Sequence, residues 1–225
     1  KRGKNFTETR KYALAPFIES LANYDLQLAY YAPRTDRIRP YVKFGLATGG
    51  YRTDNTSVDL RHETVNFGLG LILNTSSQIR ASLNFFEFQK ENNWEVFQRD
   101  NLFGYFDKKM ISSGLDIDWF PGNNQEFRLK AFVYAIKANN SRAFEVNPSG
   151  YMSSSNINVN DFQLSEIAFQ IRYKYEFSPL SNLYVVYTRG GKSSGELQDS
   201  FDGLYANAWN KQTLDKLIVK IRYKF

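Results

Sequence analysis

The stretch that decides the fold is Leu217-Ile218-Val219-Lys220-Ile221-Arg222-Tyr223-Lys224-Phe225, in which apolar side chains alternate with mainly charged ones. In a β-strand, successive side chains point to opposite faces of the sheet. One face of this strand therefore carries only apolar and aromatic groups, and the other carries lysine and arginine. A soluble antiparallel sheet and the wall of a membrane barrel both satisfy this pattern.

The same two-faced alternation recurs upstream. It predicts nine strands, over residues 24–31, 38–47, 63–73, 78–88, 109–119, 126–137, 162–177, 183–189 and 212–225. The pair Phe85-Phe86 breaks the alternation and predicts a β-bulge at that point. The sequence therefore indicates an all-β, antiparallel fold.

Connections of two lengths alternate along the chain. Short turns are predicted at residues 33–36, 74–77, 121–124 and 178–182, and long polar loops at residues 48–62, 89–107, 138–161 and 190–212. Short turns on one rim and long loops on the other are typical of transmembrane β-barrels. The segregation of loop lengths therefore favours a transmembrane barrel over a soluble sandwich.

The last strand resembles the C-terminal signature of bacterial outer-membrane β-barrels, which ends on phenylalanine with an aromatic residue two positions earlier. The resemblance implies an outer-membrane location in a Gram-negative bacterium and recognition by the barrel-assembly machinery. The residues that match this assembly signal are Leu217, Val219, Ile221, Tyr223 and Phe225. The tract Ser178–Thr188, taken with this strand, is similar to the closing hairpin of large Bacteroidetes-type barrels. That likeness implies the C-terminal part of a larger barrel.

Length and composition agree with one barrel domain over residues 1–225. The chain has no cysteine and no apolar run near 18 residues, which excludes a disulfide framework and a transmembrane helix. A transmembrane strand needs only about 9 to 11 alternating residues. Aromatic residues make up 16% of the chain. Those near the short turns predict an aromatic girdle: Tyr30, Trp119, Tyr173, Tyr175, Phe177, Tyr223 and Phe225.

Nine strands are an odd number, whereas bacterial single-chain barrels have an even number. Within residues 1–20, Ala13, Ala15 and Phe17 alternate, but Pro16 interrupts the run. Two explanations remain open. Residues 1–20 hold a poorly patterned tenth strand or a leader, or the chain is a fragment whose earlier strands are absent.

The face opposite the apolar one is predominantly basic. Its predicted interior wall consists of Arg39, Lys43, Arg80, Arg128, Lys130, Arg172, Lys174, Lys220 and Arg222. One interpretation is an anion-attracting passage. The other is a plugged interior in which Asp116 and Asp118 pair with Arg128 and Lys130 on the next strand.

Catalytic and ligand signals are weak. The only histidine, His62, stands beside Glu63 at a predicted strand end without a serine or aspartate partner at a motif spacing. We assign no catalytic, metal-binding or cofactor-binding residue, and no cofactor. The expected function is a channel or transport component, or the membrane anchor of a surface assembly. The alternatives are a barrel enzyme with His62 on its rim and a soluble β-rich binding domain.

The expected partners follow from the same features. They are outer-membrane lipid and lipopolysaccharide, which the net charge of +6 favours, together with the assembly machinery and other subunits of an outer-membrane complex. Nucleic acid is not expected, because the basic residues alternate along strands with apolar ones and no recognition motif is present.

Overall fold

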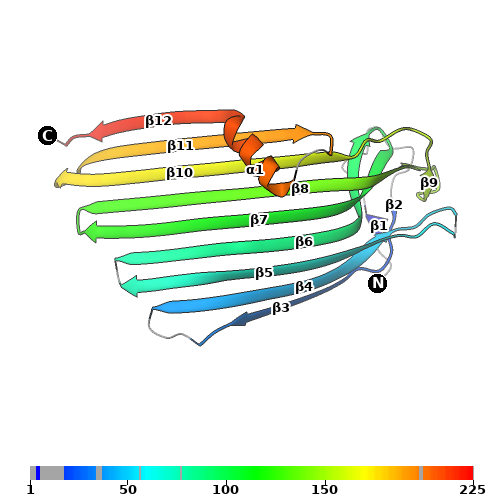
Figure 1. The fold of residues 1–225 in the computed structure, drawn as a ribbon, viewed down its shortest axis with the longest axis horizontal. Coiled ribbons are helices and arrows are strands. Elements are labelled where there is room, and N and C mark those ends of the chain that lie inside the picture. Colours follow the sequence, from blue (N-terminus) through cyan, green and yellow to red (C-terminus); the bar gives the residue numbers. More distant parts are fainter. Residues whose placement is uncertain are drawn as a thin grey trace.

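The computed structural model is one large antiparallel sheet with a single helix, and it describes residues 4–5, 18–33, 37–55, 57–76, 78–197 and 200–224. Neighbouring strands follow the order β12-β11-β10-β8-β7-β6-β5-β4-β3, with short β9 paired to β8. Figure 1 shows these strands running side by side along the long axis of the molecule. The bounds are β3 Tyr24–Tyr31, β4 Ile38–Tyr51, β5 Leu60–Ser76, β6 Ile79–Arg99, β7 Leu102–Gly122, β8 Gln125–Val146, β9 Met152–Ser154, β10 Phe162–Ser178, β11 Ser181–Gly195, α1 Phe201–Asn210 and β12 Gln212–Arg222.

The all-β antiparallel fold and the nine predicted strands are confirmed, but the strands are longer than predicted. The loop expected at residues 89–107 is wrong, because β6 continues to Arg99 and β7 starts at Leu102. The loop expected at residues 138–161 is also largely strand, since β8 runs to Val146 and β9 follows. Within residues 190–212, β11 extends to Gly195 and α1 occupies Phe201–Asn210.

Bulges explain why the alternation pattern did not predict the full length of these strands. Asn93 and Asn140 adopt positive φ angles of 56°, and the register of the neighbouring strands shifts beside each of them. An extra residue reverses which face the following side chains occupy, so a strict two-residue period breaks there. The bulge predicted at Phe85-Phe86 is confirmed, because the register of β6 shifts there against both β5 and β7.

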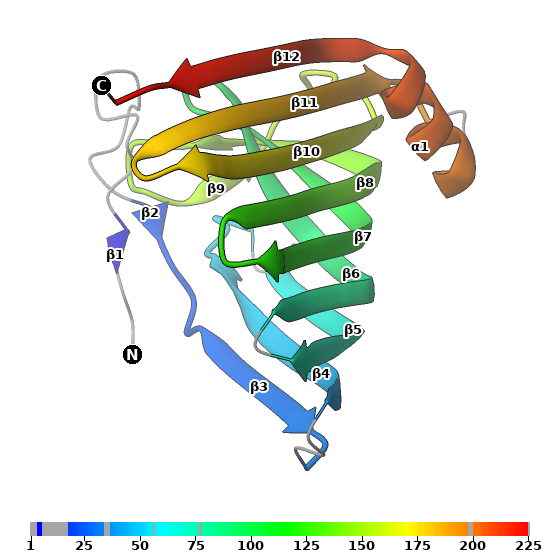
Figure 2. The ribbon, with the colours of Figure 1, turned by 90° about the vertical axis from the view of Figure 1, so that its left-hand side faces the viewer.

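The sheet is strongly curved and remains open. Figure 2 shows it curling from β12 through β8 to β3, with one concave and one convex side. In the described part of the chain, β12 pairs only with β11 and β3 pairs only with β4. The expected closed barrel is therefore not formed by the described residues.

The register separates two chemically different faces. One transverse row crosses eight strands through directly opposed, entirely apolar or aromatic residues: Ile38, Leu73, Ala81, Ile117, Leu129, Ile171, Tyr187 and Leu217. The row next to it lies on the opposite face and is mostly polar: Arg39, Ile72, Ser82, Asp116, Lys130, Gln170, Thr188 and Lys216. Directly opposed residues of an antiparallel sheet share a face, so each face is continuous from β4 to β12.

Helix α1 identifies the apolar face as the convex one. Figure 2 shows the helix on the outside of the curve. Ser165, which lies on the apolar side of β10, donates a hydrogen bond to the carbonyl of Leu204 at 2.7 Å. The helix begins after Ser200, whose side chain accepts from the amide of Gly203. A Cβ at Gly191 would collide with the carbonyl of Ala208, so this glycine allows the helix to approach β11.

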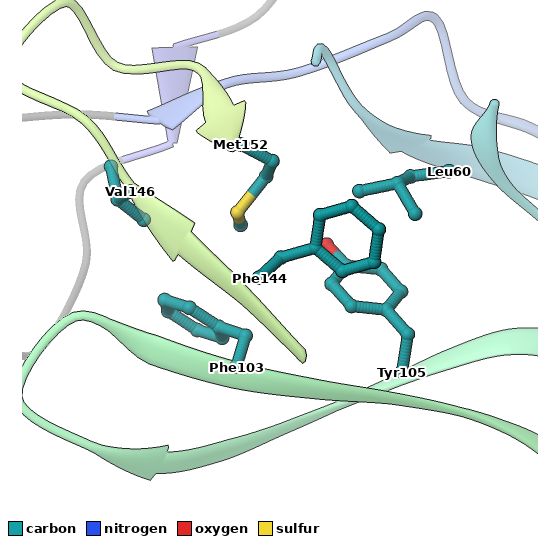
Figure 3. Packing of buried hydrophobic residues seen from close by; sticks show 6 residues of the cluster. All are labelled: Leu60, Phe103, Tyr105, Phe144, Val146 and Met152. Atoms are coloured by element: carbon teal, nitrogen blue, oxygen red, sulfur yellow. The ribbon is translucent and has the colours of Figure 1, made fainter. Parts of the chain in front are cut away.

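The main buried core lies at the rim of the long connections. It consists of Leu60, Phe103, Tyr105, Phe144, Val146 and Met152, which converge from four strands (Figure 3). The rings of Tyr105 and Phe144 meet edge to face at 5.2 Å. β9 and the start of β5 cover this end of the sheet. We call this core, together with the paired ends of β6, β7 and β8 around it, the cap.

The N-terminal segment was expected to hold a tenth strand or a leader. Two short strands, β1 Lys4–Asn5 and β2 Ile18–Glu19, pair with each other and form a sheet of their own. Ala13, Ala15 and Phe17 lie outside the described residues, as does Phe225. The tenth strand of the main sheet is instead β9.

Candidate functional site: the two faces of the curved sheet

The predicted basic wall occupies a single face of the sheet. The strand register places its members on this face, since Arg128 lies opposite Arg172, and Lys130 lies opposite Asp116. This is the face opposite α1, so it is the concave one. The complete set lies on it: Arg39, Lys43, Arg80, Arg128, Lys130, Arg172, Lys174, Lys220 and Arg222.

Part of this wall is neutralised. Lys130 Nζ lies 2.8 Å from Asp116 Oδ2, and Arg128 Nε lies 3.4 Å from Asp118 Oδ1. Arg128 also contacts Glu126. These are the cross-strand pairs expected for a plugged interior. On β6 to β8 the concave face is therefore a mixed, charge-paired surface.

Other basic residues of the wall rest on aromatic rings. The Arg39 guanidinium lies 4.8 Å from the Tyr31 ring centre, and Lys43 Nζ lies 5.1 Å from the Tyr41 ring centre. Both arrangements are cation–π contacts, which hold a cation without neutralising it.

The wall is least neutralised on β10 to β12. Within the described residues, Arg172, Lys174, Lys220 and Arg222 form no ion pair. Glu166 and Glu176 of β10 share their face, but Glu166 accepts a hydrogen bond from Tyr134 and Glu176 one from the amide of Leu180. The β10–β12 part of the concave face therefore keeps a net positive charge.

A hollow lies in the middle of the concave face. Its volume is about 530 Å³, and its lining includes Asn84, Asp116, Lys130, Phe132, Gln170 and Thr188. Gln170 donates to the hydroxyl of Thr188 at 3.3 Å, and the Phe132 ring is 47% exposed. The hollow thus combines amide, hydroxyl and charged groups with one accessible aromatic ring.

The convex face is apolar and exposed. Its open side chains include Leu28, Phe44, Phe67, Leu217, Val219 and Ile221, with Ile221 at 68% exposure. An exposed apolar surface of this extent marks an interaction site or a membrane-contacting surface. The convex face therefore offers a large apolar surface for contact with a partner or a lipid.

Aromatic residues gather on this face beside the short turns. The rings of Phe177 and Tyr223 stack at 6.3 Å, and those of Trp119 and Phe127 meet edge to face at 6.2 Å. Tyr30 lies on β3 near its own turn and is 66% exposed. The described members of the predicted girdle thus share one rim.

Two carboxyl groups, those of Glu91 and Glu95, lie largely buried at the other end of the sheet, near the cap. Tyr105 donates a hydrogen bond to Glu95 at 2.8 Å, and burial raises the pKa of the Glu95 carboxyl to about 7 although this hydrogen bond lowers it. Nearby, Lys108 pairs with Glu91 at 2.6 Å and lies over the ring of Trp94. The sequence did not reveal these pairs, because residues 89–107 were expected to be a loop.

His62 lies in β5 opposite Gly49 and is half-buried. Within the described residues, no hydrogen bond joins it to a serine or a carboxylate. No group of three or more potential metal ligands occurs there either. The described geometry therefore offers no contact that would activate His62.

The described residues of the predicted assembly signal all face the convex side. Leu217, Val219 and Ile221 are opposed to Tyr187, Val185 and Leu183 of β11, and Tyr223 stacks on Phe177. The fifth, Phe225, is outside the described residues.

Residues 30–225 match the model of a family described as a domain of unknown function, DUF5916. The chain belongs to this family. The match begins within β3 and includes every later strand, so the family's domain is the curved sheet with its helix. No curated protein matches the chain. No helix among the described residues is long and apolar enough to cross a membrane.

Proposed function

We propose that this DUF5916 domain is a wall segment of an outer-membrane β-barrel and that its concave face lines a solute passage. The observation that carries the proposal is the predominantly apolar convex face backed by a charged concave face. Lipid contacts one side of a barrel strand and the interior contacts the other, so this two-faced register is what such a wall requires.

The backbone supports the same proposal. Every backbone polar group within hydrocarbon must be paired, and helices and closed barrels are the structures that achieve this. The central strands of this sheet are paired on both sides, whereas β3 and β12 each leave one edge open in the described residues. We propose that further strands close the barrel between these edges, as the resemblance to larger Bacteroidetes-type barrels suggests.

The final strand supports the proposed location. Leu217, Val219, Ile221 and Tyr223 present the alternating apolar pattern that resembles the outer-membrane assembly signal. We therefore propose delivery to the outer membrane of a Gram-negative bacterium by its assembly machinery, with the short turns in the periplasm and the cap outside.

A passage is favoured over a plain anchor by the surplus charge on β10 to β12. Arg172, Lys174 and Lys220 project to the concave side and lack ion-pair partners among the described residues. Unneutralised charges of one sign along a pore raise the local concentration of the opposite ion. The proposed passage therefore prefers anions.

Planar-bilayer recording of the full-length protein tests this function. The protein is first folded into phosphatidylcholine vesicles, and folding is checked by circular dichroism and by protection of the sheet from protease. We expect steady conductance with anion selectivity in a KCl gradient. Arg172→Gln combined with Lys174→Gln should reduce that selectivity. The matched control is Lys90→Gln combined with Lys109→Gln, which removes the same number of charges from the convex face.

The other outcomes separate the alternatives. Insertion without conductance would leave the anchor role and reject the passage. A folded, monodisperse protein in detergent-free buffer would reject the membrane barrel in favour of a binding domain. An activity lost in His62→Ala would instead support the enzyme.

A further inference from the structure

Three lysines lie directly opposite one another on the convex face. Lys90 of β6 is opposed to Lys109 of β7, and Lys109 is opposed to Lys137 of β8. Each lies two positions from an apolar convex residue on its own strand, namely Phe88, Ile111 and Ala135, which form the neighbouring row toward the short turns. We call these three residues the lysine row.

The lysine row is electrostatically unfavourable by itself. Opposed residues of antiparallel strands have Cα atoms only about 4.5 to 5.5 Å apart, and like charges at such positions destabilise a sheet. Within the described residues, none of the three forms an ion pair with a carboxylate. Lys137 Nζ lies instead 5.1 Å from the Phe201 ring centre of α1.

Nearby acidic groups do not neutralise the row. Glu63 and Asp107 lie on the same face one row further toward the cap, and Asp107 accepts a hydrogen bond from Asn140. Two lysines of the concave face, Lys108 and Lys130, each have a carboxylate partner, whereas Lys174 and Lys220 have none among the described residues. The lysine row therefore lacks carboxylate partners of the kind that Lys108 and Lys130 have.

The depth of the row matches a membrane interface. Lys109 and the exposed Trp119 lie on the same face of β7, ten residues apart. At about 3.4 Å per residue and a strand tilt of about 40°, this separation spans roughly 26 Å. The apolar band of an outer-membrane barrel is about 25 Å tall. If the aromatic residues beside the short turns lie at one boundary of this apolar band, the lysine row lies at the other boundary.

We propose that Lys90, Lys109 and Lys137 bind the phosphate groups of a phosphorylated lipid of the lipopolysaccharide type. The acyl chains of this lipid lie against the part of the apolar convex face below the row that α1 leaves uncovered. Charge complementarity carries the assignment, because three adjacent ammonium groups directly above an apolar surface suit an amphiphile with an anionic phosphate head. The inference rests on the proposed membrane barrel and deepens it by naming a lipid site.

The test uses the full-length protein folded in detergent, after insertion into vesicles has been verified. Bisphosphorylated lipid A is titrated, and binding is followed by native mass spectrometry. Lipid A stripped of its phosphates is the ligand control. We expect the triple variant Lys90→Gln, Lys109→Gln and Lys137→Gln to bind the phosphorylated lipid about 100-fold more weakly, or about fivefold per lysine. The stripped lipid should bind wild type and variant equally weakly.

The matched protein control is Lys174→Gln, Lys216→Gln and Lys220→Gln, which removes the same charge from the concave face and should retain binding. Lys→Arg at the three row positions keeps the charge and should also retain binding. This variant shows whether a loss in the glutamine variant comes from the missing charge or from misfolding. Equal losses in both glutamine triples, or equal binding of the stripped lipid, would overturn the site. Competition by inorganic phosphate at the same concentration as the lipid would assign the row to free phosphate instead. Failure of the wild type to insert would reject the proposed function itself.

Discussion

At the scale of single residues, the most unusual group is the Glu95 carboxyl in the cap. Glu95 accepts a hydrogen bond from Tyr105, which is almost completely buried, and Arg142 is opposed to Tyr105 on the neighbouring strand. Burial raises the Glu95 pKa to about 7 from an ordinary value of 4.5. The carboxyl therefore changes its charge near neutral pH, inside a packed cluster.

The cap should lose stability as the pH rises from 5 to 8. Between pH 4.5 and about 7 the folded state holds a proton on Glu95 that the unfolded state has released, so the free energy of unfolding falls as pH increases. The expected loss is about 3 kcal/mol. Hydrogen–deuterium exchange of residues 94–106, corrected for the intrinsic pH dependence of exchange, measures it.

Glu95→Gln preserves an acceptor for Tyr105 and should abolish this pH dependence. Glu145→Gln, which changes a cap carboxylate that accepts from Ser155, is the control and should leave the slope unchanged. A slope that persists in Glu95→Gln would assign the pH dependence to another group.

At the scale of the strand, neighbouring residues of β8 test the assignment of faces. Val133 projects to the convex side opposite Ile167, and Phe132 projects to the concave side opposite Gly114. Val133→Arg should destabilise the membrane-inserted state by about 2 to 4 kcal/mol, because it places a charge in lipid. Phe132→Arg lies at nearly the same depth and should cost much less, since it points into the polar interior. Urea unfolding in lipid vesicles compares the two, and equal losses would show that the faces are wrongly assigned.

The strands also show what the sequence could predict. Alternation over residues such as Phe127 to Ala135 requires no knowledge of neighbouring strands, so it revealed both the strands and their faces. The bulges at Asn93 and Asn140 concealed the cap, because each reverses the alternation in a polar stretch. Helix α1 is stabilised by contacts with Ser165 and Gly191, which are distant in sequence. The lysine row depends on register across three strands, which no single strand discloses.

At the scale of the whole molecule, the two free edges of the sheet, β3 and β12, bear most directly on the proposed barrel. Every residue of β3 and β12 is exposed, and both strands present apolar side chains on the convex face. Unpaired edges are aggregation-prone in water and are not tolerated in hydrocarbon. A sheet of this curvature therefore needs partners on both edges to be stable in a membrane.

Amide hydrogen exchange can detect those partners directly. In an edge strand the amides that face the neighbour are protected, and the alternate amides that point away exchange freely. For the full-length protein in vesicles, we expect both sets of β12 amides between Leu214 and Arg222 to be protected, as both sets of the central strand β7 should be. Residues 1–225 alone should protect only the set that faces β11. Fast exchange of the outward set in the membrane-inserted full-length protein would mean that β12 remains a free edge, and the barrel would have to be rejected.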